Sequence, residues 1–228
     1  MRSAVAGAVL GLALAIGAPT AWSLTRPPAT AGAPVSAVLE TSSAPWVGRR
    51  DNAATAPTDP GPTVAARDAA PTAPAEFPAP VRIQIPALLV DSVVDPVGVA
   101  SDGQMAIPED VDRIGWYRFG PTPGEAGSAV IAGHVDDREQ GLGVLAPLRD
   151  AAVGAEIVLT NADGTGTRWR IVSRELISKQ ALPLDRLFTR TGPPRLTLIT
   201  CGGPFLPEYR SYRDNVVVVA ELIGGQVR

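Results

Sequence analysis

The feature that most constrains the fold of this chain is a series of short apolar runs, separated by turns rich in glycine, proline and aspartate, that extends from Val81 to Ile223. Some runs alternate apolar and polar side chains, which is the period of a β-strand, and others are β-branched almost throughout. The clearest runs cover residues 81–85, 128–135, 156–160, 167–176, 195–201 and 215–223. About seven or eight short strands, with one or two short helical turns, predict a compact all-β barrel or sandwich.

Residues 25–80 have a different composition from the rest of the chain. They are rich in Ala, Pro, Thr and Ser, show no sustained apolar period, and include Pro-Thr-Asp-Pro-Gly-Pro-Thr at 57–63. Such a segment cannot bury enough apolar surface to offset the entropy of ordering it, and proline stiffens it toward extended conformations. We predict a disordered linker here, followed by a single folded domain over residues 81–228.

Residues 1–24 predict export and membrane attachment. A short basic start precedes an apolar stretch from Ala4 to about Leu24. About 20 apolar residues span a bilayer, whereas the apolar region of a cleaved signal is about 7–15 residues long. We therefore expect a retained single-pass anchor with the domain outside the cell. Small residues near Ala18 keep cleavage, and hence secretion, as the alternative.

Charge and metal-binding residues exclude two classes of function. The formal net charge is −3 at pH 7 and no cluster of Lys and Arg is present, so a nucleic-acid partner is not expected. The chain has one cysteine, Cys201, and one histidine, His134, which excludes a Cys/His zinc cluster. We expect no cofactor. A lone cysteine in an exported protein is inert, paired between molecules, or a reactive thiol.

Cys201 and His134 occupy equivalent places in the sequence pattern. Each ends an apolar run, and each is followed by a loop: Gly-Gly-Pro after Cys201, and a loop with Asp136 and Asp137 after His134. Two strand ends can meet at one mouth of a barrel even when many positions separate them. A nearby imidazolium favours the nucleophilic thiolate, and imidazole can deliver a proton to a leaving amine. The pattern indicates a thiol acyl-transfer site.

A cation is expected near this thiol. Arg213 lies 12 positions beyond Cys201, at the start of the last predicted strand, so the intervening loop can fold back and bring the guanidinium to the sulfur. A permanent cation there would stabilise a tetrahedral oxyanion. Arg210 is the rival, and we prefer Arg213 because the start of a strand fixes it better. Asp136 and Asp137 invite a calcium site, but without further carboxylates we predict solvated loop charges.

These residues resemble the sortase family. Thr-Leu-Ile-Thr-Cys at 197–201 is similar to the sortase signature Thr-Leu-x-Thr-Cys, and Gly133-His134 after an apolar strand resembles the family's histidine site. Arg213 before Asn-Val-Val-Val resembles the arginine that opens the family's last strand. The resemblance covers roughly Val81 to Ile223, and the Cys-Gly-Gly and Tyr-Arg-Asp-Asn stretches look most like actinobacterial class F (class E/F).

The resemblance implies a closed eight-stranded β-barrel and a two-step acyl transfer. Cys201 would attack the Thr–Gly carbonyl of an LPxTG-like sorting signal, and His134 would protonate the departing amine. An amine of a peptidoglycan precursor or a pilin lysine would then resolve the thioacyl enzyme. Within the signature, Thr200 and Thr197 would bind substrate, although Thr200 points to the opposite face of an ideal strand from Cys201.

Two other functions stay open. One is a different thiol enzyme acting on wall peptides. An L,D-transpeptidase expects a Gly-Cys-Arg type sequence that Thr-Cys-Gly does not supply, and a papain-like enzyme places its cysteine on a helix and before its histidine. The other is a non-catalytic wall-binding β-domain in which Cys201 is a small buried apolar residue.

Overall fold

A closed barrel of antiparallel and parallel strands forms the folded domain. The computed structural model describes residues 28–40 and 77–227. The barrel strands are β2 (Pro80–Ile85), β3 (Val90–Val97), β4 (Ile114–Tyr117), β5 (Ser128–Ala132), β8 (Glu156–Asn161), β9 (Gly166–Ser178), β10 (Arg195–Leu206) and β11 (Ser211–Val227). They follow one another in the order β9-β11-β10-β5-β4-β3-β2-β8, and β8 pairs with β9 to close the ring. The predicted closed eight-stranded barrel is confirmed.

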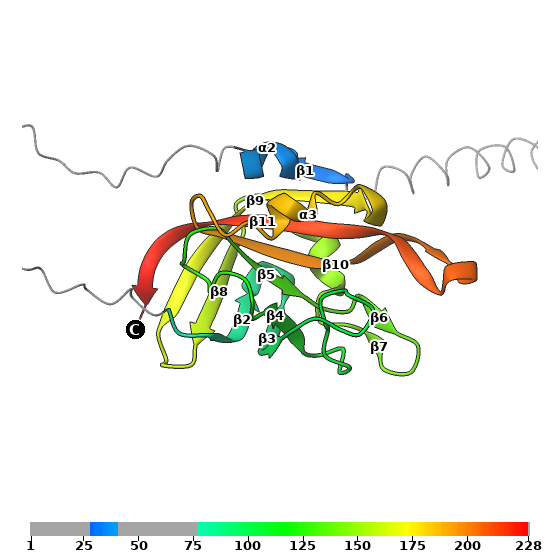
Figure 1. Cartoon of the computed structure of the whole chain (residues 1–228), viewed down its shortest axis with the longest axis horizontal. Coiled ribbons are helices and arrows are strands. Elements are labelled where there is room, and N and C mark those ends of the chain that lie inside the picture. Colours follow the sequence, from blue (N-terminus) through cyan, green and yellow to red (C-terminus); the bar gives the residue numbers. More distant parts are fainter. Residues whose placement is uncertain (1–27, 41–76, 228) are drawn as a thin grey trace, which may run out of the picture.

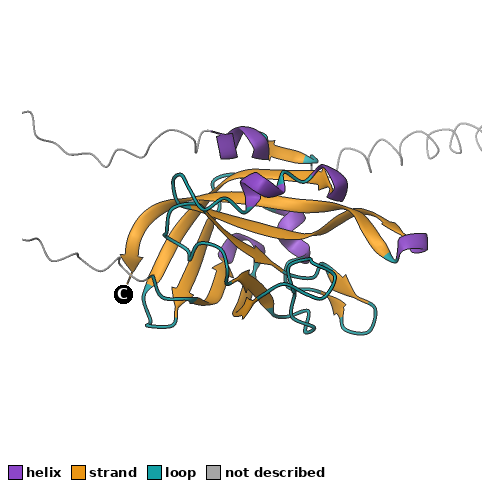
Figure 2. Cartoon of the chain, viewed as in Figure 1, coloured by secondary structure: helices purple, strands orange, loops and turns teal. Residues whose placement is uncertain are grey.

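The remaining elements are short (Figure 2). A two-stranded sheet of β6 (Asp136–Asp137) and β7 (Gly141–Leu142) follows β5. The helices are α2 (Val35–Glu40), α3 (Leu184–Leu187) and the 3₁₀ turns η2 (Pro86–Leu88), η3 (Ala146–Asp150), η4 (Lys179–Ala181) and η5 (Pro207–Tyr209). The helix α3 is a single turn of four residues, in keeping with the one or two short helical turns expected of this fold.

The barrel interior is filled mainly by aliphatic side chains from all eight strands. Trp169 is fully buried among them, and its indole N–H donates to Thr167 Oγ1 (2.9 Å). On β10 and β11 the inward residues are Leu196, Leu198, Val216, Val218 and Ala220. This alternation explains why the two strands keep their register.

A second apolar cluster lies on the outer face of the same two strands. Val217 and Val219 are fully buried there although they point away from the barrel interior. We call this group the outer cluster. Its buried members are Val35, Leu39, Leu187, Val217 and Val219, with Val38, Val172, Ile177, Leu182, Phe188 and Ile199 packed against them. Because β10 and β11 are covered on both faces, their sequences are nearly continuous apolar runs rather than alternating ones.

Part of the expected linker is folded and covers the outer cluster. Residues 30–40, which we call the N-terminal strap, consist of β1 (Thr30–Gly32) and α2. β1 pairs with β9 over residues 173–175, beyond the stretch that β8 occupies, and α2 inserts Val35 and Leu39 into the cluster. Figure 1 shows the strap lying across β9 and β11.

The prediction of a linker without folded structure from 25 to 80 therefore needs correction for the strap. The strap docks for two reasons. β9 is longer than β8, so part of its edge is free to pair with β1. Val35 and Leu39 lie one helical turn apart on α2, so both side chains reach the outer cluster. Gly32 is required at the turn, since it has φ 82° and a Cβ there would lie 2.4 Å from the Val172 carbonyl oxygen.

The predicted anchor, residues 1–24, and linker residues 41–76 lie outside the described residues. Within residues 28–40 and 77–227, no helix combines the length and the apolar character needed to cross a bilayer.

Candidate active site

Parallel pairing of β5 with β10 brings the predicted nucleophile and its partner to one rim of the barrel. Ala132 lies opposite Ile199, and the Gly133 N–H donates to the Ile199 carbonyl (3.2 Å). His134 and Cys201 each come two residues after this pair. Neighbouring strands lie about 4.8 Å apart, and residues two apart share a face. The register therefore brings His134 and Cys201 to the same rim of the barrel.

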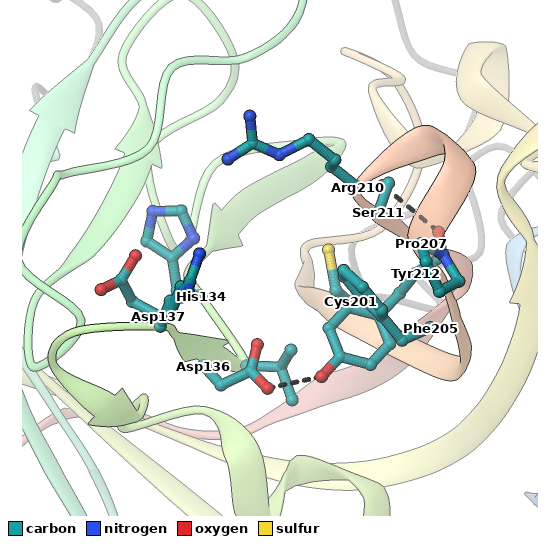
Figure 3. A pocket seen from close by; sticks show the side chains of 11 residues that line it. His134, Asp136, Asp137, Cys201, Phe205, Pro207, Arg210, Ser211 and Tyr212 are labelled. Carbon is teal, nitrogen blue, oxygen red and sulfur yellow. Dashed lines mark hydrogen bonds between the residues drawn. The ribbon is translucent and has the colours of Figure 1, made fainter.

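Both side chains line an open pocket at this rim (Figure 3). The pocket has a volume of about 650 Å³, and its walls come from the loop after β5 and from the hairpin of β10 and β11. In Figure 1 this hairpin projects beyond the barrel, with η5 at its tip. The lining residues are His134, Val135, Asp136, Asp137, Arg138, Cys201, Phe205, Pro207, Arg210, Ser211 and Tyr212.

Cys201 has the environment of a reachable thiol. It is free and only half-buried, and it faces the same open space as His134 (Figure 3). The expectation for an inert core cysteine is full burial. The half-buried position instead leaves the sulfur accessible to a substrate that enters the pocket.

The structure separates the two candidate arginines. Arg210 lines the pocket, where it follows η5 with φ 47°, and Arg213 does not. The Arg213 guanidinium is held by its neighbour Asp214, with Nε and Nη2 each 2.9 Å from a carboxylate oxygen. These hydrogen bonds raise the pKa of Arg213. The Arg213 side chain is 57% exposed and Asp214 is buried.

Strand register nevertheless places Arg213 on the face of Cys201. Asn215 lies opposite Cys201 in the β10–β11 ladder, and Arg213 precedes Asn215 by two residues, so the three positions share a face. The choice between Arg213 and Arg210 as the cation beside the sulfur therefore stays a prediction, with register supporting one and pocket lining supporting the other.

The two threonines predicted to bind substrate lie elsewhere. Thr200 is buried, and its hydroxyl donates to the Gly133 carbonyl (2.8 Å). Thr197 is fully buried and shares a hydrogen bond with the Ser128 hydroxyl (2.8 Å). Neither residue lines the pocket. In this structure both tie β10 to β5, and Thr200 thereby fixes the residue before His134.

Two carboxylates expected to be solvated are engaged at the pocket. The Tyr212 hydroxyl donates to Asp136 Oδ2, and the Glu139 and Gln140 N–H groups donate to Asp137 Oδ1 (2.8 and 3.0 Å). The latter bonds are the main cause of a lowered pKa of Asp137, and the charge of His134 contributes in the same direction. The contact between Tyr212 and Asp136 could not be predicted from the sequence, because no local pattern relates positions 136 and 212.

No metal site was predicted. Among the residues that the structure describes, no three His, Cys, Asp or Glu side chains lie close enough together to hold a metal ion. Asp137 is exposed, as predicted for a solvated loop charge, whereas Asp136 is half-buried and accepts a hydrogen bond from the Tyr212 hydroxyl.

The fold and the pocket together define a class of protein: a β-barrel with a free cysteine and a histidine at the ends of two paired strands. The sortase domain model matches residues 83–223. The chain therefore belongs to the sortase family, whose members are cysteine transpeptidases.

Solved structures of other sortases are similar to this chain. Sortase A of Listeria monocytogenes has 22% identity and a TM-score of 0.50, with 66% of this chain and 92% of that chain covered. Sortase A of Corynebacterium diphtheriae, a lid mutant, has 18% identity and a TM-score of 0.49, covering 66% and 73%. A Clostridium perfringens sortase D5 transpeptidase has 25% identity and a TM-score of 0.47, covering 64% and 79%. A search of curated proteins finds no match.

Proposed function

We propose that this chain is a class E/F sortase that cleaves an LPxTG-like sorting signal between threonine and glycine and transfers the acyl group to an amine. The acceptor is a cell-wall precursor or a pilin lysine. The observation that carries the proposal is the placement of a half-buried free thiol and the single imidazole in one open pocket, on paired strand ends.

The pocket residues supply both steps of the reaction. The Cys201 sulfur attacks the threonine carbonyl carbon, and a C–S bond forms. His134 gives a proton to the glycine nitrogen as the C–N bond breaks, which leaves a thioacyl enzyme. The acceptor amine then attacks the thioester, loses a proton to His134, and the C–S bond breaks to release the thiolate. One amide bond replaces another, so the balance needs no redox partner.

Arg213 is proposed to stabilise the oxyanion, with Arg210 as the alternative. A guanidinium presents forked donors that suit a developing oxyanion, and Asp214 holds that of Arg213 in a defined orientation. Gly203 permits this arrangement because a Cβ there would lie 2.2 Å from Asp214 Oδ2.

The finer assignments rest on sequence. Cys-Gly-Gly after the signature and Tyr-Arg-Asp-Asn before the last strand support class E/F. The apolar residues 1–24 support a domain tethered to the outer face of the membrane, with the intervening segment as its spacer. Because the strap attaches residues 30–40 to the barrel, fewer residues of that spacer are left to separate the domain from the membrane.

The experiment that tests the proposal is mass spectrometry of Cys201 after incubation with a panel of LPxTG-like peptides. A thioacyl adduct that loses the residues after threonine, and that a primary amine releases as a new amide, is the expected result. Cys201→Ala should abolish the adduct, with a loss of turnover on the order of 10⁴ or more, while the fold persists because little volume is removed.

Three outcomes would contradict the proposal. Near-normal turnover by Cys201→Ala would remove the nucleophile from the mechanism. A Cys201 that resists every peptide and every thiol reagent would favour a non-catalytic β-domain, whereas an adduct that only water releases would favour a thiol hydrolase.

A further inference from the structure

The pocket has two walls that meet through one side-chain contact. The loop wall carries His134, and the hairpin wall carries Cys201 and Arg210. The Tyr212 hydroxyl joins them by donating to Asp136 Oδ2 (Figure 3). Within the described part of the chain, this is the one hydrogen bond between residues 134–143 and residues 201–213.

The hairpin end of this contact is fixed by packing. Tyr212 on β11 lies opposite Phe205 on β10, where the ladder resumes after an irregular register between Gly202 and Phe205. The two rings pack edge to face with centroids 5.3 Å apart. Because an aromatic pair of this geometry resists sliding, Tyr212 is attached to both strands of the hairpin.

The loop end is equally constrained. Asp136 belongs to β6 and lies opposite Leu142 on β7. The Gln140 side chain in the same turn donates to the Glu109 carbonyl (2.9 Å) and accepts from the Val111 N–H (3.3 Å). The β6–β7 hairpin is thus fastened to the barrel on its far side.

The charged group that interacts with the imidazole, Asp137, lies on the same loop and does not tie the ring to the hairpin wall. Among the described residues, no hydrogen bond is made by the His134 ring. The barrel register ends at Gly133, whose carbonyl accepts from Thr200 (2.8 Å). The direction of the ring therefore depends on the backbone that runs from Gly133 to Asp136.

We propose that Tyr212 is a positioning residue for the Cys201–His134 pair: by binding Asp136, it holds the loop wall against the hairpin wall and sets the imidazole relative to the sulfur. This inference rests on the proposed function. The hydroxyl remains a donor at working pH, since the hydrogen bond to Asp136, burial and nearby negative charge raise the pKa of Tyr212 to about 12.

The test uses the reactivity of Cys201 toward iodoacetamide, followed over pH in the full chain, together with kcat and KM for a sorting peptide. Tyr212→Phe removes the hydroxyl and keeps the ring against Phe205. Tyr209→Phe is the matched control, because Tyr209 is 74% exposed on the same hairpin and does not line the pocket. His134→Ala provides the reference for an uncoupled thiol.

We expect Tyr212→Phe to slow alkylation near neutral pH about tenfold and to move its pH profile toward that of His134→Ala. The value of kcat should fall by a similar factor, with KM within about twofold of wild type. Tyr209→Phe should match wild type in every measurement. A purely structural role would lower thermal stability and leave the pH profile of alkylation unchanged.

A second pair of variants keeps the test decisive if Tyr212→Phe folds poorly. Asp136→Asn retains an acceptor oxygen for the tyrosine hydroxyl and should keep most of the reactivity, whereas Asp136→Ala should lose it. Tyr212→Phe combined with Asp136→Ala should be no worse than either change alone, because both remove the same bond.

Three results would overturn the inference: a wild-type alkylation profile in Tyr212→Phe, additive effects of the two changes, or a His134→Ala profile identical to wild type. A rise in KM alone would instead make Tyr212 a substrate contact. Alkylation needs no peptide. If the wild-type protein forms no thioacyl adduct with any sorting peptide, the proposed function is refuted. The alkylation rates of the variants would still test whether Tyr212 positions His134 relative to Cys201.

Discussion

The inner and outer faces of β10 and β11 are both apolar, but they are covered in different ways. On the inner face, Leu198, Val216 and Val218 are enclosed by the hydrogen-bonded wall of the barrel. On the outer face, Val217 and Val219 are covered by two short helices, α3 and α2 of the strap. The inner face is enclosed by a continuous ladder of strands. The outer face is packed against two separate short helices, whose apolar side chains contact it.

The two faces also end differently at the rim. The outer face continues from Ile199 to half-buried Cys201, and the inner face continues from Val216 to Asp214, which is buried against the backbone of Gly203. The strand pair thus carries stability on the face that the barrel seals and the proposed chemistry on the face that opens. Substitutions on the two faces should consequently separate loss of activity from loss of stability.

Apart from loss of the thiol itself, the largest expected effect lies at the open end of the outer face. Arg213→Lys should lower kcat/KM by about 10²–10³, because an ammonium lacks the forked donors of guanidinium, with little change in the melting temperature. Arg210→Lys is the matched control and should retain most activity. Steady-state kinetics with one sorting peptide decides between them. If Arg210→Lys shows the loss and Arg213→Lys does not, the oxyanion role belongs to Arg210.

Substitutions of two neighbouring valines on β11 compare the packing of the barrel interior with that of the outer cluster. Val218 points into the barrel and Val219 into the outer cluster, and both are fully buried. Val218→Ala should cost about 2–3 kcal/mol in the free energy of unfolding, and Val219→Ala about 1 kcal/mol less, because movable helices can collapse onto the smaller side chain. Urea denaturation measures both. Equal costs would mean that the outer cover is as rigid as the barrel.

The strap offers a smaller effect. Gly32→Ala should detach residues 30–40, since the new Cβ meets the Val172 carbonyl, while the barrel loses only about 1–2 kcal/mol. Hydrogen exchange should show faster exchange of amides in the strap and of Leu176, whose N–H donates to Ala29. Gly164→Ala is the control, with φ 80° but no neighbour near the added Cβ. Unchanged exchange in the Gly32 variant would contradict the docking described above.

The smallest expected effect is a stability loss at alkaline pH. Tyr212 has a pKa of about 12 in the folded protein against an ordinary value of 10.0, so its contribution is fully present below pH 10 and is lost as pH rises toward 12. Urea denaturation between pH 9 and 11.5 should show the stability gap between wild type and Tyr212→Phe narrowing. Tyr209→Phe should follow wild type throughout. A constant gap would show that Tyr212 titrates normally.

The sequence by itself determined the class of fold and singled out the two side chains proposed to react. The alternation of residues 81–85 and the β-branched run before Cys201 are local properties, and strand formation depends on such short-range patterns. The single cysteine and histidine needed no structure to be singled out, because each ends an apolar run. The structure places both in one pocket.

Only the tertiary structure decided how distant segments meet. The strap was expected to be part of a linker because residues 25–80 as a whole are rich in Ala, Pro, Thr and Ser and show no sustained apolar period. The outer cluster that captures Val35 and Leu39 is assembled from strands far along the chain. The contact of Tyr212 with Asp136 joins positions 76 residues apart and depends on the bulge near Phe205. Register and long-range packing fix these features, and neither leaves a local pattern in the sequence.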